Sequence, residues 1–587
     1  MTNNPRIYLW IALALMVWLN YDAWQRDYGP RTDVVTNTTQ PANGSPASTS
    51  PATSDLANQI PQTPKAAAPA NGVPPSSTAG TSAGSSSTAG TPSAAGTVPG
   101  STTTASPDSA AAPVIHVRTD VLDLDISTRG GILQRVDLLN YPKIKGEAAP
   151  VRLENTDDPQ SLYLLQSGLT GPQPTPTHLT ALTSERSDYQ LGNGNELRVP
   201  LAWTDDQGVK VTKTFVFRRG EYRVDIDYDV DNHSQSPWTA AAYAQILRND
   251  PRTKRSMFNV ETYAYHGPAL YDGKKYRKLD TADRDDSHLS ADVTNGWIAA
   301  LQHHFVTAIV PAKDEPYHFT LNSAADQYRL AAEGPAHTVA PGGSAKFGTD
   351  IFVGPKLQRQ LKATGPDLAR VTDYGYLYVL AQPLFIVLDA VDSFFGNWGV
   401  AIILVTFLLK LAFYPLSEAS GRSMAKMKQL QPRIKNLQET YKDDAEKRGR
   451  AMMELYQREK INPIAGCLPI IIQIPVFLAF YWVLLESVEM RQAPFAFWIH
   501  DLSSRDPLFV LPAIMAAAMF TQYKLNPAPP DPVQAKVFMF MPLVMSFMFA
   551  FFPAGLVLYW VTNTVLSIAQ QWNINRRIAT AGAKKKT

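Results

Sequence analysis

Long apolar runs are concentrated in the last third of the chain and predict a membrane-embedded region. The clearest run covers residues 398–416 and contains one charged residue, Lys410. A helix that crosses the hydrocarbon of a bilayer needs roughly 20 residues, so this run is long enough to span. The five spans predicted in this region lie at residues 398–416, 467–485, 507–523, 537–552 and 555–571.

A sixth apolar run, residues 7–19, follows Arg6 near the start of the chain. The residues after it lack the small-x-small pattern of a cleavage site, so we predict an uncleaved membrane anchor within residues 1–24. Residues 25–112 consist mainly of Pro, Ala, Ser, Thr and Gly. Such a segment cannot bury enough apolar surface to offset the entropy of ordering it. We predict a disordered linker without a binding role.

Residues 113–360 show the alternation of apolar and polar positions that is typical of β-strands. The clearest example is a predicted hairpin, in which residues 209–217 and 222–230 alternate on either side of a turn that contains Gly220. About 240 residues of this pattern, without helical periodicity, predict an antiparallel β-sandwich. A sugar-binding or mutarotase-like site is an open alternative for this domain.

Residues 366–395 connect the β-region to the membrane region and place apolar side chains on one helical face. Asp389 and Asp392 interrupt the apolar run too soon for a spanning helix. We therefore predict an amphipathic helix that lies at the outer membrane interface. Packing of the same face against the β-domain is the alternative.

The distribution of basic residues predicts the orientation in the membrane. Residues 417–462 carry eleven Lys and Arg, whereas residues 487–506 carry two. Because basic residues accumulate on the cytoplasmic side, the long loop, the basic tail at residues 578–587 and both termini are predicted to be cytoplasmic. Six is an even number of spans, which also places both termini on the same side of the membrane. The predicted fold class is a multi-domain integral membrane protein: a six-span α-helical bundle, made of the anchor and a five-helix core at residues 396–577, with a periplasmic all-β sandwich domain.

Composition and motifs argue against several functions. The chain has no HExxH, Walker or CxxC pattern, and its GxSxG match at residues 80–84 lies in the predicted linker, which disfavours a hydrolase, an ATPase or a redox enzyme. The net charge of +2 gives no argument for nucleic-acid binding, and the single cysteine, Cys467, gives no disulfide framework. Four histidines of the β-region show no metal-ligand spacing and are predicted to be solvated or structural: His233, His266, His303 and His304.

Lys410 is the most informative position in the apolar runs. A lysine inside hydrocarbon costs several kcal/mol unless it snorkels, pairs or faces water. Snorkelling to the headgroups is one interpretation, since six residues separate Lys410 from the end of its run. We favour a cationic site that faces a hydrated groove, because other polar residues also occur inside the spans. The residues predicted to line this substrate-binding groove are Lys410, Thr406, Gln473, Trp560, Asn563 and Gln570.

The cytoplasmic loop, residues 417–462, repeats apolar residues at intervals of three and four. This spacing, interrupted by Asp443 and Asp444, predicts an antiparallel helical hairpin with basic flanks. A solvated helical pair without a partner is one interpretation, and a docking surface for ribosomal RNA or acidic partners is the other. The residues predicted to contact substrate or the ribosome are Met424, Lys426, Met427, Lys428 and Arg433.

Several short segments of the membrane region carry a family resemblance. They are Gly396-Asn397-Trp398-Gly399, Tyr414-Pro415-Leu416, Ser423-Met424-Ala425-Lys426-Met427, Asn462-Pro463 with Gly466-Cys467-Leu468-Pro469, Arg491-Gln492-Ala493-Pro494-Phe495, and Phe552-Pro553-Ala554-Gly555-Leu556. In this order, over about residues 396–577, they resemble the YidC membrane protein insertase family. The anchor, the linker and the β-domain resemble the longer Gram-negative form of that family.

The resemblance implies an insertase and folding chaperone of the bacterial inner membrane, not an enzyme, with no nucleotide or metal cofactor. Its implied partners are nascent membrane proteins, the Sec translocon, the ribosome and membrane lipids. Members of the family often carry arginine in the groove where this chain has Lys410. Lysine keeps the positive charge but lacks the planar guanidinium that donates two parallel hydrogen bonds. The residues themselves leave two alternatives: a proton-coupled secondary transporter that titrates Lys410, and a carbohydrate enzyme tethered to the membrane.

Overall fold

The computed structural model describes residues 58–61, 112–249, 264–324, 326–442, 444–459, 468–525 and 532–584. The chain divides into two units, Met1–Ala52 and Thr53–Thr587, and all described residues belong to the second. The predicted anchor and most of the predicted linker therefore lie outside the described residues.

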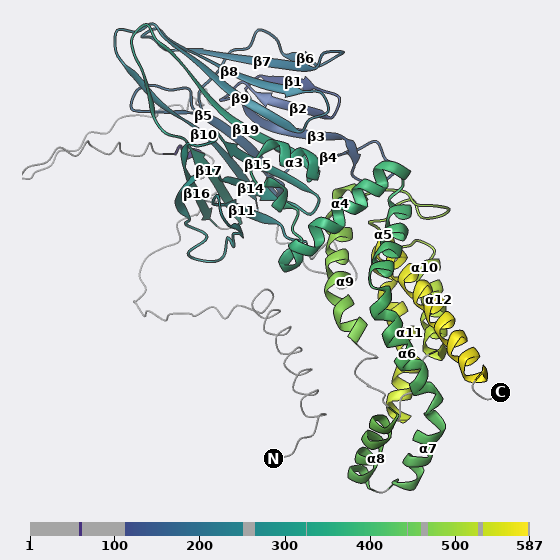
Figure 1. Ribbon diagram of the computed structural model, residues 1–587. Helices are drawn as coiled ribbons and strands as arrows, with labels where there is room; N and C mark the ends of the chain where they lie inside the picture. The colour runs from purple at the N-terminus through teal and green to yellow at the C-terminus, as the bar shows by residue number, and fades with distance from the viewer. Residues whose placement is uncertain are drawn as a thin grey trace, which may run out of the picture. The chain divides into compact units, whose positions relative to one another are not determined.

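Two β-sheets form the first part of this unit (Figure 1). The larger sheet has the strand order β13-β16-β17-β10-β5-β3-β2-β1-β6, with β18 paired to β10 and β4 paired to β3. Its strands are β1 (Val114–Arg118), β2 (Leu122–Ser127), β3 (Ile132–Pro142), β4 (Pro150–Arg152), β5 (Tyr163–Thr170), β6 (Asp188–Gln190), β10 (Trp238–Asn249), β13 (Ser290–Thr294), β16 (Pro316–Ala324), β17 (Gln327–Glu333) and β18 (His337–Val339).

The smaller sheet has the order β12-β11-β14-β15-β19-β9-β8-β7. Its strands are β7 (Glu196–Thr204), β8 (Val209–Arg218), β9 (Arg223–Asn232), β11 (Gly267–Tyr271), β12 (Tyr276–Lys278), β14 (Trp297–Leu301), β15 (Phe305–Pro311) and β19 (Ser344–Pro355). One buried cluster contains Leu165 and Ile246 of the larger sheet together with Phe215 and Ile351 of the smaller sheet, so the two sheets share a core.

The hairpin predicted from the alternating pattern is confirmed as β8 and β9. The two strands pair antiparallel, with Phe217 opposite Val224 and Val211 opposite Val230. These four side chains are buried in the shared core. Burial of each such side chain stabilises the domain by about 2 kcal/mol.

The second part of the unit is helical (Figure 1). Its helices are α3 (Gln358–Thr364), α4 (Tyr378–Phe395), α5 (Trp398–Ala412), α6 (Tyr414–Gln429), α7 (Gln431–Thr440), α8 (Ala445–Arg458), α9 (Leu468–Glu486), α10 (Val510–Leu525), α11 (Pro532–Phe549) and α12 (Ala554–Lys584). A β-sheet domain followed by a helical region is the coarse architecture that the sequence predicts, and the structure confirms it.

Three of the predicted helical segments differ from the structure. The run at residues 398–416 is not one helix, because α5 ends at Ala412 and α6 begins at Tyr414, with Pro415 in its first turn, at an angle of 69° to α5. Proline lacks the amide hydrogen that would continue the hydrogen-bond ladder. The predicted helix at residues 366–395 begins only at Tyr378, after two short 3₁₀ turns, and the predicted last span continues to Lys584 in a single helix.

The predicted number of six spans is not confirmed by the described helices. By length and composition, one stretch, Gly375–Phe395, can cross a membrane, and the bent pair α5 and α6 makes a second if it is counted as one span. Two shorter apolar helical stretches lie at Gln473–Glu486 and Ala535–Phe549. Two other apolar helices are short for a span, since α5 has 15 residues and α10 has 16.

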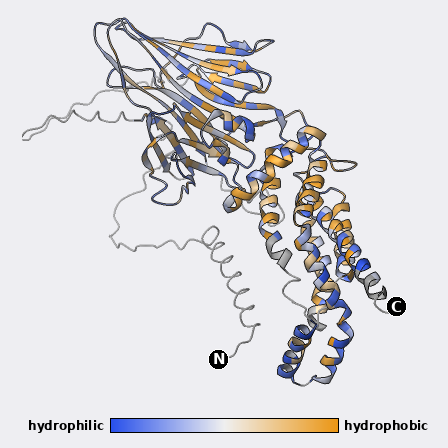
Figure 2. Ribbon diagram, in the orientation of Figure 1, coloured by the Kyte–Doolittle hydropathy of each residue, from blue (hydrophilic) through white to orange (hydrophobic). Residues whose placement is uncertain are grey.

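The helices pack around their own core and leave apolar side chains exposed. Phe385 and Leu388 of α4 and Ile402 of α5 belong to a buried cluster that also includes Phe480 of α9 and Leu556 of α12. Figure 2 shows hydrophobic residues along α4, α5 and α9, whereas α7 and α8 are largely hydrophilic. The exposed apolar side chains on α4, α5 and α11 include Val379, Ile386, Phe394, Phe407, Leu411, Phe540, Leu543 and Phe547. An exposed apolar surface of this kind fits contact with lipid.

Candidate functional site

The start of α5 is fixed by close contacts, and this orients the helix. Asn397 is the N-cap: its side-chain oxygen accepts a hydrogen bond from the amide of Val400 at 3.0 Å, and its side-chain nitrogen donates to the carbonyl of Phe495 at 2.9 Å. Gly399 lies against the Phe495 ring, where a Cβ atom would come within 2.0 Å of a ring carbon. Lys410 follows three turns later, near the end of α5.

One face of α12 carries the polar residues that oppose Lys410. Asn563, Ser567 and Gln570 are spaced by four and three residues, so they lie on the same side of the helix. Trp560 lies one turn before Asn563 on that face. The α12 helix therefore presents a polar stripe to α5 and α9 within an otherwise apolar group of helices.

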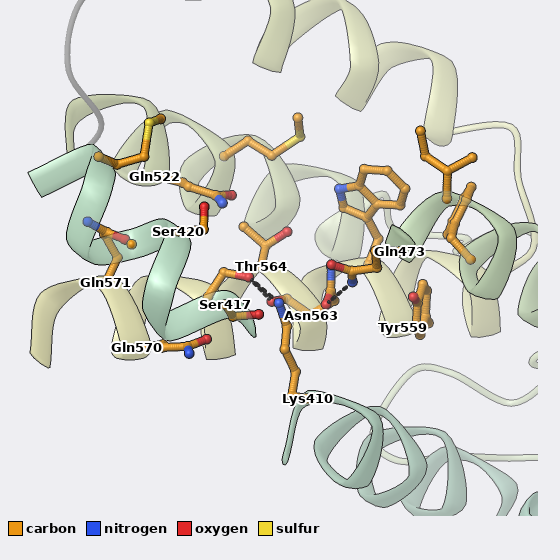
Figure 3. Close-up of a pocket in the computed structure, with 17 residues that line it drawn as sticks. Lys410, Ser417, Ser420, Gln473, Gln522, Tyr559, Asn563, Thr564, Gln570 and Gln571 are labelled. Carbon is orange, nitrogen blue, oxygen red and sulfur yellow. Dashed lines mark hydrogen bonds between the residues drawn. The ribbon is translucent and has the colours of Figure 1, made fainter. Parts of the chain in front are cut away.

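A cavity of about 340 Å³ lies between these helices (Figure 3). The residues that line it come from α5, α6, α9, α10 and α12. They are Lys410, Ser417, Ser420, Gly421, Met424, Gln473, Ile474, Phe477, Met519, Gln522, Tyr559, Trp560, Asn563, Thr564, Ser567, Gln570 and Gln571.

Hydrogen bonds connect the polar side chains of the cavity (Figure 3). The ammonium of Lys410 donates to Ser567 Oγ at 2.7 Å, and the Ser567 hydroxyl donates to the carbonyl of Asn563 at 2.7 Å. Gln473 Nε2 donates to Asn563 Oδ1 at 2.9 Å. These bonds hold the Lys410 ammonium against α12, at the wall of the cavity.

Lys410 is the only charged side chain among the 17 described residues that line the cavity, and none of them is acidic. A cation in apolar surroundings is costly unless an anion or water compensates it. Gln570 Nε2 is also buried, without a hydrogen-bond partner in the described part of the chain. The cavity therefore offers hydrogen-bond donors and one positive charge to a ligand that brings acceptors or a carboxylate.

The structure brings five of the six predicted groove residues to this cavity. Lys410, Gln473, Trp560, Asn563 and Gln570 line it. Thr406 does not line it. Its hydroxyl donates to the Ile402 carbonyl at 2.6 Å, and it faces a separate space of about 20 Å³ that adjoins Lys410, Gln473 and Asn563.

Sequence reasoning missed two groups of lining residues. Ser417 and Ser420 lie in α6 beside Met424, which the sequence predicts only as a contact of the cytoplasmic hairpin, and Met519 and Gln522 come from α10. The spacing of Ser417, Ser420 and Met424, at three and four residues, is a helical signal that follows directly on Lys410. No comparable signal marks the positions on α10.

The five predicted contact residues of the hairpin have different environments. Met424 lines the cavity, and Met427 packs against the buried cluster that joins α7 to α8. Lys426 is exposed. Lys428 donates to the carbonyl of Leu525, the last residue of α10, at 3.1 Å, and Arg433 pairs with Glu459 at 2.6 Å.

Comparisons with known proteins decide the family. Residues 114–387 match the family described as the YidC periplasmic domain, and residues 390–581 match the family described as 60Kd inner membrane protein. The membrane protein insertase YidC of Thioalkalivibrio sulfidiphilus (strain HL-EbGR7) is 44% identical over 599 residues, which cover 99% of this chain and 100% of that protein. The chain belongs to the YidC membrane protein insertase family. The YidC of Pseudomonas fluorescens (strain SBW25) is 43% identical over 590 residues, with 99% of each chain covered.

Two solved structures are also similar to this member of the YidC family. A crystal structure described as an active YidC insertase with the first transmembrane domain resolved aligns with a TM-score of 0.35 and 18% identity, covering 78% of this chain and 94% of that chain. A galactose mutarotase related enzyme from Lactobacillus acidophilus aligns with a TM-score of 0.28 and 10% identity, covering 41% and 97%. Membership in the YidC family rests on the sequence matches and implies an inner-membrane protein with a periplasmic domain.

Proposed function

We propose that this chain inserts hydrophobic segments of nascent proteins into the inner membrane through the polar cavity around Lys410. The observation that carries the proposal is a single cation, without an acidic neighbour among the lining residues, inside a group of apolar helices. Such a site fits a transient acidic or polar segment better than a permanent ligand. The relatives that match over their whole length are named insertases, not enzymes.

The free energy for insertion comes from the client. Moving about 20 apolar residues from water to hydrocarbon is favourable by many kcal/mol, so no nucleotide or metal is required. The difficulty lies in the polar residues that must cross ahead of the apolar segment. Hydrogen-bond donors and acceptors from Gln473, Asn563 and Gln570 keep those residues solvated, and Lys410 attracts a carboxylate where Coulomb interactions exceed those in bulk water.

The finer topology belongs to the same proposal. We infer six spans with both termini in the cytoplasm, the β-domain in the periplasm, and an amphipathic helix, α4, at the outer interface. The exposed apolar side chains of α4 support the interfacial helix, and the basic residues of α6, α7 and α8 support a cytoplasmic hairpin. Action as a folding chaperone, work beside the Sec translocon and contact between the hairpin and the ribosome are further parts of this proposal.

Reconstitution of the purified chain into protein-free lipid vesicles tests the insertase activity. A single-span client is synthesised in the presence of these vesicles, and protease protection reports its insertion. We expect insertion to rise with the amount of protein, without added nucleotide and without leakage of small solutes. Solute flux driven by a proton gradient, with no client insertion, would contradict the proposal and favour the secondary transporter.

A further inference from the structure

A short part of the predicted linker, residues 58–61, contacts the β-domain. The carbonyl of Gln59 accepts hydrogen bonds from Arg329 Nη1 at 2.9 Å and from Gln245 Nε2 at 3.4 Å. The carbonyl of Pro61 accepts one from Thr170 Oγ1 at 3.2 Å. The three donors lie on β17, β10 and β5, which are neighbouring strands of the larger sheet. These contacts correct the expectation that the whole linker has no binding role.

The donors lie on the face of the larger sheet that points away from the smaller sheet. On β10, Ala244 and Ile246 belong to the core between the sheets, so Gln245 points to the opposite face. On β17, Leu330 belongs to that core, and its neighbour Arg329 also points to the opposite face. The segment at residues 58–61 is therefore held on the outer face of the sandwich.

This outer face carries buried polar groups with unused hydrogen-bonding capacity. Gln245, Arg329 and Glu333 are 0%, 6% and 3% exposed, respectively. Within the described residues, Arg329 Nε and Glu333 Oε1 have no hydrogen-bond partner. Gln245 Nε2 also donates to Gln166 Oε1 on β5 at 2.6 Å, which orients its amide. A buried donor without an acceptor is costly, and the Gln59 carbonyl gives Arg329 Nη1 its shorter hydrogen bond, whereas Arg329 Nε and Glu333 Oε1 stay unpaired with residues 58–61 in place.

The segment also stands out from the sequence around it. Between residues 36 and 112, the only Leu is Leu56 and the only Ile is Ile60. Asp55 and Lys65 are the only charged residues between positions 34 and 107. A residue before proline favours an extended backbone, so Ile60 is predisposed to the conformation in which carbonyls are free to accept from side chains.

We propose that the outer face of β5, β10 and β17 is a peptide-binding site, and that its ligand is residues 58–61 of the same chain. The ligand class is an extended peptide with an aliphatic residue before proline, held through its main-chain carbonyls. Arg329 supplies the strongest contact, because its donor is charged. Binding within the chain limits the reach between the predicted anchor and the β-domain from about 300 Å to about 110 Å of fully extended chain.

Photocrosslinking of the full chain in its membrane tests this site. Benzoylphenylalanine replaces Gln59, whose side chain is exposed, so the carbonyl that accepts the hydrogen bonds is kept. We expect crosslinks to peptides that contain β5, β10 or β17. The matched control carries the same probe at Ser86, elsewhere in the linker, and is expected to show no preferred peptide. An excess of a synthetic peptide with the sequence of residues 53–66 is expected to compete with the crosslink.

Two variants separate specific binding from proximity. Ile60→Asp lies outside the β-sandwich and cannot unfold it, and it is expected to reduce the crosslink about tenfold because a half-buried aliphatic side chain becomes a charge. Arg329→Gln is expected to reduce it by a similar factor, with protease resistance of the β-domain as the check on folding. Equal crosslinking from positions 59 and 86, or a crosslink from position 59 that survives Ile60→Asp, would overturn the proposal.

Discussion

At the scale of residues, Asn563 connects the polar groups of the cavity. Its side-chain oxygen accepts from Gln473, and its backbone carbonyl accepts from Ser567, which in turn accepts from Lys410. These bonds join α9, α12 and α5. Hydrogen bonds in apolar surroundings are stronger than in water, so the chain of contacts keeps the ammonium directed at the cavity wall.

We expect Ser567→Ala to reduce insertion about two- to threefold for clients with an acidic residue in the translocated segment. The change removes the hydrogen-bond acceptor 2.7 Å from the Lys410 ammonium and leaves the charge in place. Thr562→Ala is the matched control, because Thr562 also donates to the carbonyl four residues earlier and does not line the cavity. Equal defects in the two variants, measured by protease protection of the client, would argue against a role for the Lys410–Ser567 contact.

Sequence alone predicts the groove residues that are polar inside apolar runs. Lys410, Gln473 and Asn563 meet that condition, and all three line the cavity. Thr406 shares a helix face with Lys410, but a threonine hydroxyl can bond to its own helix backbone, and here it does. Ser417 could not be recognised in this way, because it lies in a segment whose basic residues predict a cytoplasmic loop.

Glu154 gives the β-domain a stability that depends on pH. The carboxyl is fully buried, Thr307 donates to its Oε1 at 2.7 Å, and burial raises its pKa to about 7 from an ordinary value of 4.5. Between pH 4.5 and 7 the unfolded chain loses this proton and the folded chain keeps it. The free energy of unfolding is therefore expected to fall by about 3 kcal/mol over this interval and to level off above it.

Glu154→Gln is expected to remove the contribution of Glu154, because the amide keeps an oxygen for Thr307 and does not titrate, and to leave that of Glu333, whose pKa burial also raises to about 7. Glu147→Gln, at an exposed position, is the matched control and should retain both contributions. Calorimetric unfolding of the β-domain between pH 4.5 and 8 measures the effect. A parallel pH dependence in the two variants would mean that other groups cause it.

At the scale of elements, proline breaks and helix length decide how well sequence predicts the membrane region. The apolar run before Pro415 predicts a helix, and α5 forms there, but the turn of 69° into α6 depends on packing that the run does not encode. The polar residues after position 571 end the predicted span, although α12 continues to Lys584 because polarity does not interrupt a helix. The bounds of an apolar run in the sequence therefore need not coincide with the bounds of the helix that contains it.

We expect the α7–α8 hairpin to contribute to insertion of the client and not only to the stability of the protein. Deleting residues 431–458, with a short Gly-Ser connection in their place, should reduce insertion more than it reduces the amount of membrane-embedded protein. The reason is that Leu430, Ile434 and Tyr456 form a small core separate from the main helical core, so its loss leaves that core intact. Glu446→Gln is the control, since its exposed pair with Arg450 contributes little to stability and neither residue is a predicted contact of the hairpin. Equal losses of insertion and protein would show that the hairpin is structural.

At the scale of the whole molecule, contacts connect the β-domain to the end of α9 and to the loop that follows it. Arg491 donates to the carbonyl of Pro142 at 2.9 Å, and His303 Nε2 lies 3.0 Å from the carbonyl of Leu485. Burial lowers the pKa of His303 to about 3, so the ring is neutral at pH 7 and donates to that carbonyl. Sequence predicts the order of the two domains, but not these contacts, because their acceptors are main-chain carbonyls that any residue supplies.

The β-domain is expected to be dispensable for insertion, because the cavity and the hairpin lie outside it. Deleting residues 121–342 should leave insertion within about twofold of normal and should lower the thermal stability of the helical part, because the Arg491 and His303 contacts are lost. Insertion and thermal unfolding are measured on the same preparation. A stable membrane-embedded variant that inserts no client would place the activity in the β-domain.

The central claim is that the charge of Lys410 acts on the client. The direct measurement compares clients that differ in one acidic residue of the translocated segment, inserted into vesicles that carry Lys410→Arg, Lys410→Ala or Lys410→Glu. We expect arginine to retain insertion, because it keeps the charge. Alanine should impair the acidic client about tenfold and the neutral client less, and glutamate should impair the acidic client further.

An arginine variant that is present at normal levels and inserts neither client would contradict this account. Arginine keeps the charge but does not release its proton in the working range. Its failure would therefore mean that position 410 has to transfer a proton. Equal, weak effects of all three changes on both clients would likewise contradict it, because a lysine that only snorkels is insensitive to the charge of the client. The predicted result is a functional arginine variant together with an alanine defect that follows the acidic residue of the client.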